Sequence, residues 1–140
     1  MTKQAKVLVI DGQGGRLGAL VIEGLRAAAD FSAEVSIIAV GTNAAATAAM
    51  LKAGADVGAT GSYPVVYHAP RAAVIIGPVG ILAAGSLGGE ITPEAAEAVA
   101  LSDADKFLIP SERCTLHVVG PRLSLPEYAA LAVRGAVEAL

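Results

Sequence analysis

The sequence predicts an α/β fold: a single domain over residues 1–140, in which a mostly parallel sheet of about five or six strands carries helices on both faces, in three layers. Three observations predict it. Apolar runs rich in β-branched residues alternate along the chain with amphipathic segments, as in successive βαβ units. The length of 140 residues suits one domain. Hydrophobic residues make up 54% of the chain and charged residues 16%, which excludes a disordered chain.

The first half of the chain contains two predicted strand–helix units. Residues 5–11 form a continuous apolar run up to the final aspartate, which is typical of a strand covered on both faces. A glycine turn follows, and apolar residues then recur at helical spacing over 17–28. A second buried strand is predicted at 35–40. The next helix is expected from about Asn43, a natural N-cap, to Lys52.

The middle of the chain is less regular. Within 56–71 the run PVVYH is compatible with a short strand, and 72–77 predicts a further buried strand. Thr92 and Pro93 are typical of a helix start, so a helix is expected over 92–101.

The last third of the chain predicts two strands and a helix. Residues 106–110 form an apolar run, and 115–120 alternate in the manner of an edge strand. The sequence SLPE at 124–127 is a capping box, which opens a final amphipathic helix through Leu140.

Composition narrows the possible partners. The formal net charge is −3, and ten Lys and Arg residues are scattered along the chain, so no basic stripe predicts nucleic-acid binding. The uncharged runs 35–51 and 72–89 are divided by glycine turns, so no membrane association is expected.

The lone Cys114 excludes an intrachain disulfide, and with no signal peptide it predicts a cytoplasmic protein. Few charges and alanine-rich helices favour a homo-oligomer.

Glycines gather where the predicted strands end. They cluster at 12–18 after the first strand, at 41 after the second, and at 77–89 after the strand at 72–77. Loops expected at the opposite edge, such as 30–34 and 102–105, contain no glycine. Because the carboxyl ends of parallel strands share one edge of an open sheet, these turns predict a ligand crevice there.

The first glycine loop has the strongest rationale. It joins a strand to a helix, whose N-terminal amides and dipole suit a phosphate. The sequence GQGGRLG resembles the nucleotide loop of dihydrodipicolinate reductase and related nicotinamide-dependent enzymes. The resemblance implies NAD(P) or another nucleotide as ligand; the alternative is a tight turn with no ligand. The expected contacts are Gly12, Gln13, Gly14, Gly15, Arg16, Leu17 and Gly18.

Further contacts are expected from the neighbouring strand ends, at Gly77 and Pro78, and at Thr42 and Asn43 on the ribose side. Asn43 fits equally well as a plain N-cap. The second strand does not end in the acidic residue that usually binds a ribose 2′-hydroxyl.

Three residues are candidates for a catalytic role, namely Asp11, Glu90 and Cys114. Asp11 would repel a pyrophosphate unless Arg16 or a metal offsets its charge, and it is also a possible lone Mg²⁺ ligand. No set of residues has metal-ligand spacing, so no metal site is predicted. Glu90 suits a general acid or base, or else belongs to a sharp turn. Cys114 is a possible nucleophile or an idle thiol; His117 would face the opposite side of the predicted edge strand.

Taken whole, VIDGQGG, GTNAAATAAMLKAGA, GATG, IIGPVGI and GEITPEAAEA resemble an uncharacterised family of short bacterial Rossmann-like proteins, a domain of unknown function. The resemblance implies a Rossmann-like fold and nucleotide binding, with no known activity. A nucleotide-binding protein of unknown reaction is therefore the first hypothesis. The alternatives are a non-enzymatic effector-sensing or assembly subunit, and a hydrolase or transferase that uses Cys114 or a metal at Asp11.

Overall fold

The computed structural model describes residues 4–28, 30–111 and 114–140. Its sheet has five strands, all parallel, in the order β3-β2-β1-β4-β5. This confirms the predicted α/β, Rossmann-like fold. The strands are β1 (Lys6–Asp11), β2 (Ser36–Gly41), β3 (Val57–Thr60), β4 (Val74–Pro78) and β5 (Asp105–Ile109).

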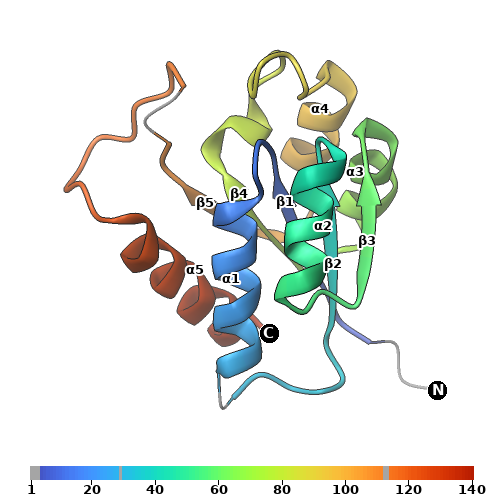
Figure 1. The fold of residues 1–140 in the computed structure, drawn as a ribbon, viewed down its shortest axis with the longest axis vertical. Coiled ribbons are helices and arrows are strands. Elements are labelled where there is room, and N and C mark those ends of the chain that lie inside the picture. The colour runs from blue at the N-terminus through green and yellow to red at the C-terminus, as the bar shows by residue number, and fades with distance from the viewer. Residues whose placement is uncertain (1–3, 29, 112–113) are drawn as a thin grey trace.

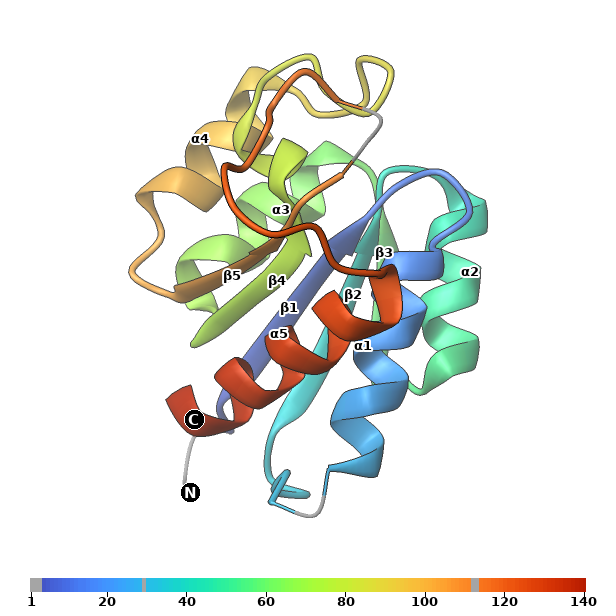
Figure 2. The ribbon, with the colours of Figure 1, turned by 90° about the vertical axis from the view of Figure 1, so that its left-hand side faces the viewer.

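Helices cover both faces of the sheet, so the molecule has three layers (Figures 1 and 2). On one face lie α1 (Arg16–Ala27), α2 (Ala44–Ala53) and α5 (Leu125–Ala139), with α1 in contact with both of the others. On the other face α3 (Ser62–His68) packs against α4 (Pro93–Leu101). This division follows from right-handed crossovers, because the chain steps outward from β1 to β3 and then returns to β4 on the other side of β1. The short 3₁₀ turns η1 (Ala69–Arg71) and η2 (Val79–Leu82) flank β4.

The central strands divide the core in two. In β1, Val7 and Val9 face the layer of α1, α2 and α5, while Leu8 and Ile10 face α3 and α4, and all four side chains are fully buried. A strand buried on both faces has no polar side to alternate with, which is why its sequence is continuously apolar.

The helix boundaries confirm the predicted caps. Asn43 Oδ1 accepts a hydrogen bond of 2.9 Å from the Ala46 amide at the start of α2. Thr92 caps α4 in the same way, and Ser124 and Glu127 form the expected capping box of α5. Among the described residues, no helix is both long and apolar enough to cross a membrane.

The segment 56–71 differs from the expectation. Its strand is β3, Val57–Thr60, whereas the run PVVYH lies in α3. Pro64 falls in the first turn of α3, where the amide it lacks would have no partner inside the helix, so it does not oppose helix formation.

The edge strand predicted at 115–120 is wrong, since these residues pair with no strand. Pro110 directly follows β5, and the chain then crosses the carboxyl edge of the sheet toward α5 instead of running alongside β5 (Figure 2). The alternating apolar pattern at 115–120 therefore does not correspond to a strand in the sheet. Val119, one of its apolar residues, is 99% exposed. The inference that His117 faces away from Cys114 depended on that strand and falls with it.

Candidate functional site

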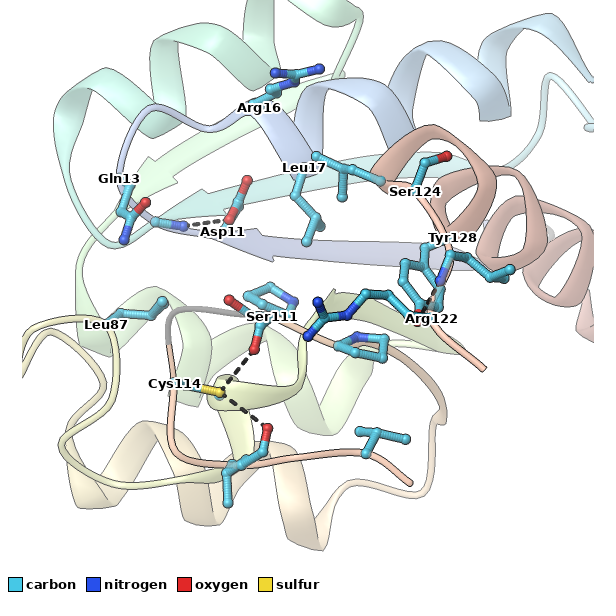
Figure 3. Close-up of a pocket in the computed structure, with 18 of the residues that line it drawn as sticks. Asp11, Gln13, Arg16, Leu17, Leu87, Ser111, Cys114, Arg122, Ser124 and Tyr128 are labelled. Atoms are coloured by element: carbon cyan, nitrogen blue, oxygen red, sulfur yellow. Dashed lines mark hydrogen bonds between the residues drawn. The ribbon is translucent and has the colours of Figure 1, made fainter. Parts of the chain in front are cut away.

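A pocket lies at the carboxyl edge of the sheet, above the point where the strand order reverses. From β1 the chain continues to β2 on one side, and it later returns to β4 on the other side. Ligands of open α/β sheets bind at such switch points. The cavity measures about 730 Å³, and three parts of the chain line it: the β1–α1 loop, the stretch after β4, and the segment between β5 and α5 (Figure 3).

The glycine loop supplies one wall of this pocket. Most of the contacts expected from the sequence lie in the lining, namely Gly12, Gln13, Gly14, Gly15, Arg16, Leu17 and Pro78. The other four, Gly18, Thr42, Asn43 and Gly77, lie outside it. Figure 3 shows Arg16 on the far side of the loop, with its guanidinium turned away from the cavity. The side chain expected to meet a phosphate therefore does not point into the pocket.

Asp11 is the last residue of β1, directly before the glycine loop, and it is buried, with 6% of its surface exposed. Its Oδ1 accepts a hydrogen bond of 2.8 Å from the Gly12 amide, and its Oδ2 accepts one of 2.7 Å from the Gly18 amide. The Asp11 carboxyl group therefore accepts the hydrogen bond of an amide in the first turn of α1. The sequence predicted a phosphate as the acceptor for the amides of this turn. Burial raises the pKa of the Asp11 carboxyl, although the amides of Gly18, Gly12 and Leu17 act in the opposite direction.

The raised pKa of Asp11 makes a testable contribution to the pH dependence of stability. The native state binds this proton more tightly than the unfolded chain does. The contribution of Asp11 to stability therefore falls as the pH rises from about 3.9, the unfolded value, through the raised native pKa. In Asp11→Asn this titration is absent. We expect the difference in free energy of unfolding, wild type minus Asp11→Asn, to decrease over this window in urea titrations. A difference that increases with pH would contradict the raised pKa.

Two of the loop glycines serve the packing of α1 against α2. Gly15 has φ +74°, and a Cβ there would lie 2.8 Å from the Ala46 carbonyl oxygen. A Cβ on Gly18 would overlap Met50 and lie 3.1 Å from the Asp11 Cβ. Gly14 differs, because an added Cβ would meet nothing within 4 Å. The spacing of these glycines is thus explained in part by helix packing and only in part by an open approach to the pocket.

Groups from three loops lie close together at the edge above β2. A Cβ on Gly12 would lie 2.7 Å from Thr42 Oγ1 and 3.1 Å from Leu87 Cδ1. The Thr42 hydroxyl donates to Glu90 Oε1 at 3.3 Å. Asn43 Nδ2 donates to the Gln13 carbonyl at 3.1 Å, besides its role as N-cap. Thr42 and Glu90 thus bind each other across the loops, and Asn43 binds the backbone of the glycine loop.

Cys114 lies in the lining on the wall opposite Asp11 (Figure 3). Its Sγ contacts the carbonyl oxygens of Ser111 at 3.6 Å and Leu116 at 3.5 Å. Within the described parts of the chain, no three His, Cys, Asp or Glu side chains are grouped so as to hold a metal ion. The Mg²⁺ interpretation of Asp11 therefore finds no set of further ligands among them.

The second wall of the pocket comes from the segment before α5, which the sequence reasoning missed. Figure 3 shows Arg122 reaching from this wall toward the middle of the cavity, next to Tyr128 of α5. The Tyr128 hydroxyl accepts a hydrogen bond of 3.1 Å from the Leu123 amide and donates one of 3.3 Å to the Pro121 carbonyl. The sequence did contain a signal for this wall. The loop that precedes a helix starts where the preceding parallel strand ends, so the loop between the last predicted strand and the final helix must begin at the carboxyl edge of the sheet.

Comparisons with known proteins show a family and a distant structural likeness. A family model described as a domain of unknown function (DUF3842) matches residues 6–140. No curated protein matches the chain. Among solved structures, a dodecameric FMN-dependent UbiX-like decarboxylase from Escherichia coli O157:H7 is similar, with 18% sequence identity and a TM-score of 0.46. The similarity covers 92% of this chain and 75% of that one.

Proposed function

The chain belongs to this family of unknown function (DUF3842), and we propose that it binds a nucleotide, NAD(P) or another, in the pocket at the carboxyl edge of its sheet. The observation that carries the proposal is the position of the cavity. It lies at the switch point between β1 and β4, with the β1–α1 glycine loop as one wall.

The size and lining of the pocket support a small-molecule ligand. Its volume of about 730 Å³ lies within the range of roughly 300–1,000 Å³ that is usual for such sites. Apolar side chains such as Leu17 and Leu87 provide surface for a base, and Arg122 provides a positive charge. This combination of apolar walls with a few polar groups is the usual composition of a ligand site.

Gly14→Val tests the proposal, because Gly14 lines the pocket and an added Cβ there meets no protein atom within 4 Å. The valine is expected to leave the fold intact and to obstruct the pocket. In calorimetric titrations with NAD⁺, NADP⁺, ATP and the nucleoside monophosphates, the wild type should bind at least one of them, and Gly14→Val should bind it at least about tenfold more weakly.

Ala100→Val is the matched control, since Ala100 is exposed on α4 and lies outside the pocket lining. Its affinity should equal that of the wild type. The proposal fails if no nucleotide binds at millimolar concentration, or if Gly14→Val binds as tightly as the wild type while both variants stay folded.

A further inference from the structure

The end of β2 is the place where dinucleotide-binding folds carry an acidic residue, and the residues that follow β2 in this chain include none. In a Rossmann-type sheet the acidic residue accepts a hydrogen bond from the ribose 2′-hydroxyl of NAD. Here β2 ends at Gly41, and Thr42 and Asn43 follow it. The segment after β2 therefore lacks the group that usually selects a free 2′-hydroxyl.

A carboxylate reaches this place from another loop. Glu90 lies between β4 and α4, 48 positions after Thr42, and its Oε1 accepts a hydrogen bond of 3.3 Å from the Thr42 hydroxyl. A carboxylate has two oxygens and about four lone-pair positions, so one bond to Thr42 leaves it able to accept others. Glu90 is exposed, so a ligand can reach it from solvent.

The pair formed by Thr42 and Glu90 borders the pocket at Gly12. Gly12 lines the cavity, and a Cβ added to it would lie 2.7 Å from Thr42 Oγ1. The Thr42 amide donates to the Asp11 carbonyl at 2.9 Å, which fixes the end of β2 beside the start of the glycine loop. Gly88, two residues before Glu90, also lines the cavity. A ligand that extends from the cavity past Gly12 therefore meets the pair.

Hydrogen bonds and burial hold the backbone of Glu90 in place. The Glu90 amide donates to the Leu87 carbonyl at 3.2 Å. The next residue, Ile91, is 2% exposed, and its amide donates to the Ser86 carbonyl at 3.1 Å. Thr92 then caps α4. The position of the Glu90 backbone at the end of β2 is therefore set by the fold and does not require a ligand.

From these contacts we propose that Glu90 binds the ribose 2′-hydroxyl of the ligand, in place of the acidic residue that is missing after β2. This inference rests on the proposed nucleotide binding and names the ligand class: a nucleotide whose ribose carries a free 2′-hydroxyl, hence NAD(H) and not NADP(H) among the dinucleotides. A 2′-phosphate would place its negative charge beside the Glu90 carboxylate, which opposes binding. Glu90 is then a residue that determines specificity, and Thr42 is a positioning residue that acts through its hydrogen bond to Glu90.

Calorimetric titrations of the whole chain with matched ligands test the inference. The ligand pairs are NAD⁺ with NADP⁺, ATP with 2′-deoxy-ATP, and AMP with 2′-deoxy-AMP, and the members of each pair differ only at the ribose 2′ position. In at least one pair, the member with the free 2′-hydroxyl should bind roughly 10- to 100-fold more tightly, the range that hydrogen bonds to a charged group give.

Glu90→Gln keeps the size of the side chain and removes its charge, so this ratio of affinities should fall to within about threefold. Thr42→Val replaces the hydroxyl with a methyl group and leaves Glu90 without this partner, so the ratio should fall in part. Because Glu90 is exposed, Glu90→Gln should unfold at nearly the same temperature as the wild type.

Glu97→Gln is the matched control, since Glu97 is exposed on α4 and lies outside the pocket lining. It removes the same charge and should keep the wild-type ratio. If the two members of every pair bind equally, or if Glu90→Gln keeps the wild-type ratio, this inference is overturned and the proposed nucleotide binding stands. If no nucleotide binds, the proposed function itself fails, and the inference fails with it.

Discussion

Gly15→Ala is expected to lower the free energy of unfolding by about 2–4 kcal/mol, although it adds only one methyl group. Gly15 has φ +74°, a conformation that costs an alanine energy before any contact is counted. The new Cβ would also lie 2.8 Å from the Ala46 carbonyl oxygen and 2.9 Å from the Ala46 Cα. Both atoms belong to the backbone of α2, so the overlap is relieved only if α1 and α2 separate. Urea unfolding followed by circular dichroism measures the loss.

Gly14→Ala is the control for this prediction. Gly14 lies in the same loop, does not have positive φ, and has no atom within 4 Å of an added Cβ. Its substitution should change the free energy of unfolding by no more than about 0.5 kcal/mol. Equal losses in the two variants would show that close packing on Ala46 is not what requires glycine at position 15.

Ile76→Ala should have an effect of similar size for a different reason. Ile76 is fully buried in β4, where it is in register with Val9 of β1 and Phe107 of β5. Removing its side chain leaves a cavity in the core beneath the switch point, and such substitutions cost about 2–5 kcal/mol. The midpoint of urea unfolding should fall accordingly, with little change in its slope.

Val119→Ala gives the comparison for Ile76→Ala, because Val119 is 99% exposed. Its free energy of unfolding should stay within about 0.5 kcal/mol of the wild type. A large loss for Val119→Ala, or a small one for Ile76→Ala, would contradict the division of the chain into core and surface described above.

The central elements were predictable because their sequence signals are local. The strands expected at 5–11 and 35–40 match β1 and β2 to within a residue, since burial on both faces leaves an uninterrupted apolar run. The caps at Asn43 and Ser124 were predictable for the same reason, because each depends on residues within one helical turn.

The errors arose where the outcome depends on distant parts of the chain. The alternation at 115–120 is typical of a strand, but a strand needs a neighbour, and the path after Pro110 provides none. In the candidate site, too, the features that the sequence did not predict depend on distant parts of the chain. The glycine wall was visible in the sequence, whereas the hydrogen bond from the Gly18 amide to Asp11 and the close approach of Leu87 to Gly12 follow only from the packed structure.

The pocket is assembled from opposite ends of the chain. One wall begins at Asp11 and the other ends at Tyr128, more than a hundred positions later. A nascent chain that still lacks α5 cannot form the complete pocket. A molecule bound there would tie the first loop to the last helix, and it would raise the melting temperature in proportion to the logarithm of its concentration once saturating.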